Sequence, residues 1–133
     1  MFAGIHDSLL TGYSVNSETQ ELVLWMQPHQ ESAPSPFHVV FNGVAAHFFE
    51  APLLPAVLSD IASVSAERLV AEQWHSLERG YTSCGWPGPW ADTLAHATQF
   101  VQSSSLQAFR VESSYGLSGW VLARSATFHA NGL

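Results

Sequence analysis

The sequence predicts an α+β fold in which an antiparallel β-sheet, built from N-terminal and C-terminal hairpins, carries two central helices on one face. Three observations support this expectation. Residues 8–26 and 109–124 resemble half-buried strands, residues 66–79 and 90–101 have the spacing of amphipathic helices, and the strand segments flank the helical ones. A chain of 133 residues has the size of one domain, so we expect residues 1–133 to form a single domain.

The N-terminal part of the chain predicts a β-hairpin. Residues 8–15 and 22–26 are β-type runs, and the polar residues 16–20 between them suit a short loop. Residues 29–36 contain two prolines and two serines and are expected to form an exposed loop. A new strand is expected to begin at Phe37.

Two features of the next segment leave alternatives open. The dipeptide Asn42-Gly43 between apolar runs favours a second hairpin, although Gly43 could instead mark a bulge in one long strand that reaches Phe49. Residues 57–64 fit either a strand or the lead-in to a helix, because the run is short and contains Asp60.

Two helices are predicted in the middle of the chain. Ser65 can cap a helix from Ala66 to Arg79, with Gly80 after its C-cap. Its apolar stripe consists of Val70, Trp74, Leu77 and Tyr81. Pro89 opens a second helix at about Trp90. The matching stripe consists of Trp90, Leu94, Ala97 and Val101.

The C-terminal part returns to strand patterning. Ser103-Ser104-Ser105 ends the second helix, and residues 109–113 and 120–124 then alternate apolar with polar side chains. Residues 114–119 contain two glycines, which permit the positive φ angles of a hairpin loop.

All of the net negative charge lies in the first half of the chain. Residues 1–67 contain seven acids and no Lys or Arg, whereas the remainder balances four acids against four arginines. The chain has no lysine, and the scattered arginines form no basic stripe, so nucleic acid is not an expected ligand. A region of one sign attracts partners of the opposite sign, which predicts a basic protein partner for this half.

The candidate binding residues follow from charge and aromatic content. The candidates from the acidic N-terminal half are Glu18, Glu21 and Glu31. The candidates from the loop between the helices are Trp86 and Trp90. That loop is either a lid packed on the core or an aromatic binding surface. Only 11% of the residues are charged, so part of the surface is expected to be apolar. Such a surface makes a homodimer possible, and a monomer is the other possibility.

Cysteine and hydropathy patterns predict a cytoplasmic protein. Cys84 is the only cysteine, so no intramolecular disulfide can form, and the opening residues lack the pattern of a signal peptide. The most apolar stretch, residues 37–58, is interrupted by polar residues and prolines, which predicts no membrane segment.

No cofactor is predicted, and an enzyme is the less favoured interpretation. The chain has no G-x-S-x-G elbow, phosphate-binding loop, dinucleotide fingerprint or C-x-x-C pair, and no local base adjoins Cys84. No metal site and no catalytic residue are assigned. The alternative is a small-ligand or metal-dependent enzyme that uses His6 and Asp7, or His38 and His47 facing each other across the Asn42-Gly43 turn.

Three local features together resemble small uncharacterised bacterial α+β proteins, some of which serve as immunity partners of secreted toxins. These features are His6-Asp7 before a hairpin, the Phe41–Val44 turn and the Ser113–Trp120 run. The resemblance implies a non-enzymatic, immunity-like binding protein and assigns no functional residue. The function expected from the sequence is therefore a protein-binding module that uses its acidic N-terminal half.

Overall fold

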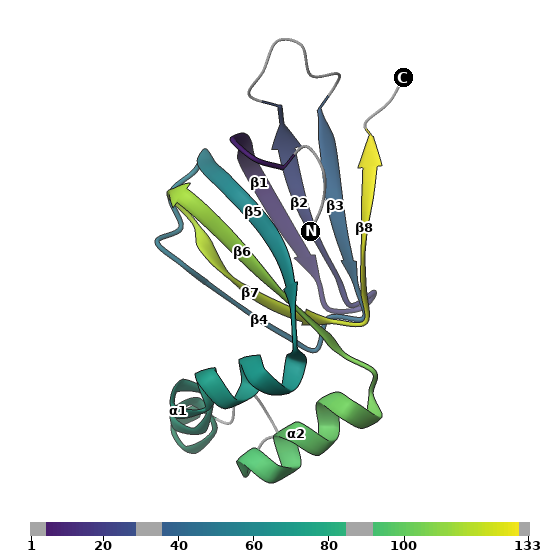
Figure 1. The fold of residues 1–133 in the computed structure, drawn as a ribbon, viewed down its shortest axis with the longest axis vertical. Helices are drawn as coiled ribbons and strands as arrows, with labels where there is room; N and C mark the ends of the chain where they lie inside the picture. Colours follow the sequence, from purple (N-terminus) through teal and green to yellow (C-terminus); the bar gives the residue numbers. More distant parts are fainter. Residues whose placement is uncertain (1–4, 29–35, 85–91, 131–133) are drawn as a thin grey trace.

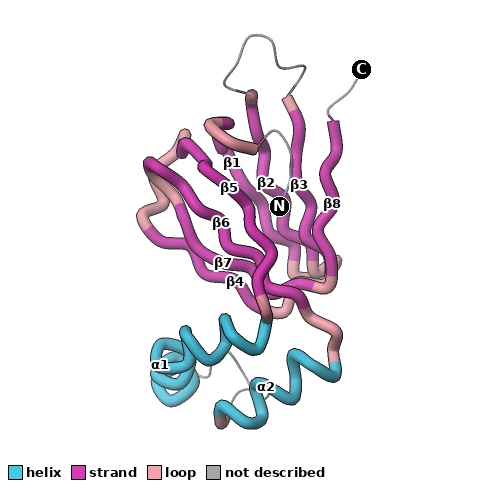
Figure 2. The backbone as a smooth tube through the Cα atoms, in the orientation of Figure 1, coloured by secondary structure: helices cyan, strands magenta, loops and turns pink. Residues whose placement is uncertain are grey.

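The described residues form an α+β fold with an eight-stranded antiparallel sheet and two helices (Figures 1 and 2). A computed structural model describes residues 5–28, 36–84 and 92–130, without the side chains of residues 80–84. The elements are β1 (Ser8–Asn16), β2 (Glu21–Gln27), β3 (Phe37–Asn42), β4 (Ala46–Glu50), β5 (Ala56–Val64), α1 (Ala66–Cys84), α2 (Leu94–Ser103), β6 (Gln107–Tyr115), β7 (Ser118–Ala123) and β8 (Ser125–Ala130).

The strands follow the order β4-β7-β6-β5-β1-β2-β3-β8. β1 pairs with β2, β6 pairs with β7, and β5 joins these two groups because it pairs with both β1 and β6. The segment at residues 57–64, which the sequence left open, is therefore a strand. Its pairing with β6 contains a bulge at Ser59, between the Leu58–Ser113 and Asp60–Glu112 pairs.

The two ends of the sheet are connected by a sharp change of direction at Arg124. β7 lies beside β4 and β6, and after this single residue β8 continues along β3 at the other edge. The backbone N–H of Arg124 donates to the Asn42 carbonyl at 2.9 Å. The sheet is therefore strongly curved, with β1, β2, β3 and β8 on one side and β4, β7, β6 and β5 on the other (Figure 1).

The predicted hairpin at Asn42-Gly43 is wrong. β3 pairs with β2 and β8, whereas β4 pairs with β7, so the two segments that flank Gly43 separate. Gly43 does adopt a φ of +64°, and a Cβ there would lie 2.9 Å from the Arg124 side chain. The glycine thus supports a turn, but the long-range pairing with β8 determines where the following strand goes.

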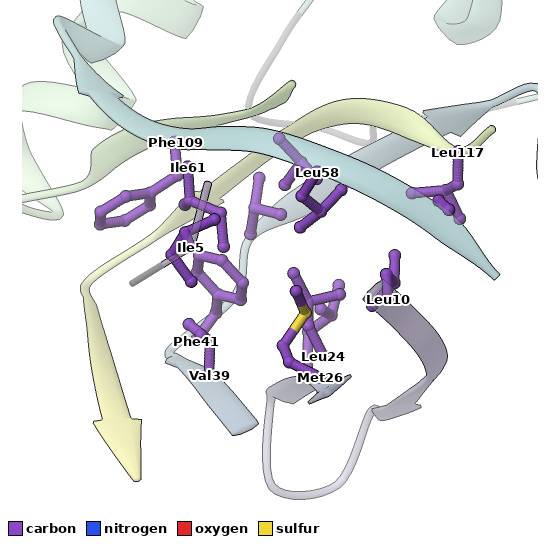
Figure 3. Packing of buried hydrophobic residues seen from close by; sticks show 14 of the residues in the cluster. Ile5, Leu10, Leu24, Met26, Val39, Phe41, Leu58, Ile61, Phe109 and Leu117 are labelled. Carbon is purple, nitrogen blue, oxygen red and sulfur yellow. The ribbon is translucent and has the colours of Figure 1, made fainter. Parts of the chain in front are cut away.

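The main hydrophobic core fills the concave side of the curved sheet (Figure 3). Alternate side chains of nearly every strand point into it, as period-two patterning requires. The largest are fully buried and come from distant parts of the chain: Ile5, Leu10, Leu22, Leu24, Met26, Phe41, Leu58, Ile61 and Leu117. This core joins both halves of the sheet.

A second core lies between the helices and the outer face of the sheet. α1 and α2 lie together beneath one end of the strands (Figure 2). β7 is buried on both faces, because Val121 and Ala123 face the concave core while Trp120 and Leu122 face the helices. The helical members of the second core are Ala66, Leu69, Val70, Leu77, Ala97 and Val101.

Each helix has one boundary where the sequence predicts it: α1 begins at Ala66, and α2 ends at Ser103, in the serine run that was expected to end it. Ser65 caps α1 through a 3.2 Å hydrogen bond from the Arg68 N–H to its Oγ, so the helix begins at Ala66 as predicted. It continues past Gly80 to Cys84 instead of ending at Arg79. α2 begins at Leu94, whose side chain is exposed, so its predicted place in the buried stripe is wrong. The side chains of Tyr81 and Trp90 lie outside the described residues.

Candidate functional site

The acidic and aromatic residues predicted from the sequence occupy different parts of the chain. Glu18 lies exposed in the β1–β2 turn, where its N–H donates to Asn16 Oδ1 at 2.9 Å, and Glu21 begins β2 beside it. Glu31, Trp86 and Trp90 lie outside the described residues. The described N-terminal candidates thus gather at one turn of the sheet.

His6 and Asp7, which the sequence analysis named as an alternative site, contact each other. His6 Nε2 lies 3.4 Å from Asp7 Oδ2, and His6 Nδ1 lies 3.3 Å from the Ser59 carbonyl oxygen. In a strand, adjacent side chains would point to opposite faces. His6 and Asp7 instead precede β1, in a turn where Asp7 adopts a φ of +63°. Both side chains are exposed, and among the described residues no third His, Cys, Asp or Glu lies close enough to hold a metal ion with them.

His38 and His47 do not face each other, so their predicted pairing is wrong. His38 lies on β3 opposite Trp25 and His129, whereas His47 lies on β4 opposite Val121. The cause is the separation of β3 from β4 described above. Within the described ranges, no three His, Cys, Asp or Glu side chains lie close enough together to hold a metal ion.

The fold opposes the protonation of His47. Its ring is half-buried, contacts the Phe49 ring at a centroid distance of 5.5 Å, and lines a small cleft with Val15 and Val44. Burial lowers its pKa from the ordinary value of 6.5, because the charged imidazolium loses hydration.

We expect acid to destabilise the protein through His47. As pH falls through about 6.5, the unfolded chain binds a proton before the folded chain does, so the free energy of unfolding decreases. Between about pH 7.5 and pH 5, this decrease should be smaller in His47→Gln than in the wild type. Thermal unfolding followed by circular dichroism measures it, with His75→Gln, at an exposed helical position, as the control. Equal slopes in all three proteins would contradict the prediction.

A cleft of about 540 Å³ lies between α1 and the outer face of β4, β6 and β7. Gln73 and Ser76 of α1 line it on the helix side. The sheet contributes aromatic and polar groups, chiefly Phe48, Glu50, Arg110, Glu112 and Trp120. A second cleft of about 400 Å³ shares Arg110 and Glu112 and continues along α1.

Strand register explains why these side chains meet. Phe48 lies opposite Trp120, and Trp120 lies opposite Arg110, so the three cross the sheet in one row. Their side chains share the outer face because residues opposite each other in a sheet point the same way. In the next row, Glu50 lies opposite Ser118 and Asp60 lies opposite Glu112. One row thus supplies rings and the other supplies carboxylates.

Two carboxylates, Glu50 and Glu112, line the cleft together with the guanidinium group of Arg110. Arg110 donates a hydrogen bond to Glu72 Oε1, and Glu72 Oε2 also accepts from Arg68 Nε at 3.2 Å, so the guanidinium groups are already paired. In the described part of the chain, no Arg or His lies within ion-pair distance of Glu50, Asp60 or Glu112. Like charges held together on one face favour a bound cation.

The sequence analysis missed this cleft. Its residues come from positions 48–50, 59, 73–76 and 110–120, and no short motif connects them. The sequence contains only a weak signal for it. Arg110 and Glu112 are two residues apart and therefore share one face of a strand, and the same holds for Phe48 and Glu50. Only the strand order β4-β7-β6-β5 shows that these pairs belong to one surface.

Comparisons with known proteins add no further assignment. No helix among the described residues has the length and apolar character needed to span a membrane. No protein-family model, no curated protein and no solved structure matches this chain.

Proposed function

We propose that this protein is a non-enzymatic binding module and that the cleft between α1 and the sheet receives a Lys or Arg side chain of a basic partner protein. The observation that carries the proposal is the pair of carboxylates at this cleft, Glu50 and Glu112, which form no ion pair with any Arg or His of the described residues. A partner's ammonium or guanidinium group would form charge-assisted hydrogen bonds with them. The resemblance noted above suggests an immunity-like form of this role, in which the partner is a toxin.

The aromatic row beside the carboxylates suits a long cationic side chain. Phe48 is 46% exposed, and its ring centroid lies 6.3 Å from that of buried Trp120. The alkyl stem of Lys or Arg packs on apolar surface while its charged end stays near polar groups, and a ring face adds cation–π attraction. The Glu72–Arg110 pair would remain intact, because the proposed ligand adds a cation to the unpaired acids.

The cleft and the β1–β2 turn are two separate acidic sites on the protein. Glu21 lies opposite Asn42, next to the corner at Arg124, whereas Glu50 lies opposite Ser118 at the far end of β7. A partner that contacts one place therefore need not contact the other. This separation provides a matched pair of variants for testing the proposal.

The test measures binding of a fluorescein-labelled arginine- and lysine-rich peptide by fluorescence anisotropy at low and high salt. The double variant Glu50→Arg/Glu112→Arg should bind at least about tenfold more weakly than the wild type, and the wild-type affinity should fall with salt. The control Glu18→Arg/Glu21→Arg makes the same change in net charge and should bind nearly as well as the wild type.

Each contrary result would overturn the assignment of the cleft. If the wild type fails to bind the peptide, no basic segment is recognised. If the control loses as much affinity as the cleft variant, attraction depends on net charge or on the β1–β2 turn. Circular dichroism of both double variants verifies that they are folded.

A further inference from the structure

A row of rings crosses the outer face of β2, β3 and β8, in the other half of the curved sheet from the proposed binding cleft. Trp25 lies opposite His38, and His38 lies opposite His129. The ring centroids of Trp25 and His38 are 4.9 Å apart, and those of His38 and His129 are 5.1 Å apart. The two imidazole planes differ by only 11°, so they stack side by side across the two strands.

A third side chain orients one of the imidazoles. His129 Nε2 lies 2.9 Å from Thr127 Oγ1, two residues earlier on the same face of β8. If Nε2–H donates to this hydroxyl, Nδ1 of the neutral ring carries the free lone pair. Histidines that bind metals commonly donate their other ring N–H to an oxygen, which holds the ring in place.

We propose that His38 and His129 form a two-histidine chelate for a borderline transition-metal ion such as Zn²⁺, Ni²⁺ or Cu²⁺. Imidazole nitrogen is a preferred ligand of these ions. Side chains directly opposite each other in an antiparallel pair have Cβ atoms about 5 Å apart, so modest side-chain rotations bring two nitrogens to a shared ion at about 2.0–2.1 Å. His129 binds through Nδ1, and water molecules complete the coordination.

The surroundings of the pair suit an exposed ion. His129 is exposed, and Trp25 is 41% exposed on the far side of His38. The next row of this face consists of Val23, Val40 and Thr127, so the register places no Lys or Arg beside the imidazoles to repel a cation. The backbone pairing of β3 and β8 already holds the two ligands together, which reduces the entropy lost on binding.

Metal binding at this pair would also fasten β8 to the sheet. β8 is an edge strand that pairs with β3 alone, and the chelate connects these two strands. An ion that binds only the folded state raises the free energy of unfolding, and with it the thermal midpoint, by an amount that grows with the logarithm of the ion concentration divided by its Kd. The proposal therefore has a thermodynamic consequence that does not depend on activity.

The test titrates the whole chain with ZnCl₂ by isothermal calorimetry and repeats the titration with His38→Gln, His129→Gln and Thr127→Val. Each histidine variant should bind at least about tenfold more weakly, and Thr127→Val should also bind more weakly because the orienting hydroxyl is lost. His75→Gln on α1 is the matched control and should bind as the wild type does. Glutamine preserves polarity and approximate size, so the variants should remain folded.

Spectroscopy identifies the ligands directly. In the wild type, Zn²⁺ should shift the imidazole NMR signals of His38 and His129 together and raise the thermal midpoint, and it should do neither in His129→Gln. Absence of zinc binding in the wild type would overturn the proposal. It would equally be overturned if His129→Gln retained wild-type affinity, or if His75→Gln lost as much affinity as the chelate variants.

Discussion

Replacement of Gly119 by alanine should destabilise the protein by about 3 kcal/mol, because the new methyl group has no space. A Cβ at this position would lie 1.8 Å from the Phe48 carbonyl oxygen, far inside van der Waals contact. Gly119 lies opposite Phe49 in the β4–β7 pair, so β4 must move away from β7. The thermal midpoint should fall by roughly 10 °C in calorimetry.

Gly12 offers a matched control for this prediction. A Cβ at Gly12 would meet only Trp25 Cδ1 at 3.9 Å, an ordinary contact, so Gly12→Ala should change the midpoint little. Phe48 and Glu50 both lie on β4, and Gly119→Ala should therefore also weaken binding of the basic peptide at a temperature where the variant is folded. Similar midpoints for the two alanine variants would contradict the steric argument.

The other large effect is expected at Phe41, where alanine should reduce the free energy of unfolding by about 4 kcal/mol. The Phe41 side chain is fully buried in the concave core, and its ring packs against Phe109 with centroids 5.3 Å apart and planes at 60°. Truncation removes this edge contact and leaves a cavity between strands from both halves of the sheet (Figure 3). Urea denaturation measures the loss.

Phe128 is the control for the same substitution. Its ring stacks on Phe37 at 4.7 Å but is 44% exposed, so Phe128→Ala should cost only about 1 kcal/mol. If Phe41→Ala does not fold, Phe41→Leu should still unfold at a lower urea concentration than Phe128→Ala. Equal losses at the two positions would show that the concave core is not the main source of stability.

Local patterns were sufficient for most strands and for the start of the first helix. Alternation located β1, β2, β6 and β7 to within a few residues, and the Ser65 hydroxyl placed the beginning of α1. These features depend on neighbours in the sequence: a side chain two residues away for a strand, and an N–H three residues away for a cap.

Long-range pairing explains where the sequence analysis failed. β8 was not predicted, although Ser125–Ala130 alternates polar with apolar side chains; in the structure it pairs with β3. Asn42-Gly43 does mark a turn, but the strands on its two sides do not pair with each other. β3 pairs with β8, and β4 pairs with β7. The end of α1 also differs from the prediction, because the helix continues through Gly80 to Cys84 instead of ending at Arg79.

The amino-acid sequence by itself determined the fold class and the excess of acids over bases in the first half, because both follow from local periodicity and composition. Only the tertiary structure decided which side chains meet. The strand order placed Glu50 with Glu112 at the α1 cleft and His38 with His129 on the outer face of the other half of the sheet. The physical reason is that strand pairing joins residues many positions apart, and the burial of the shared concave core selects that pairing over the local alternatives.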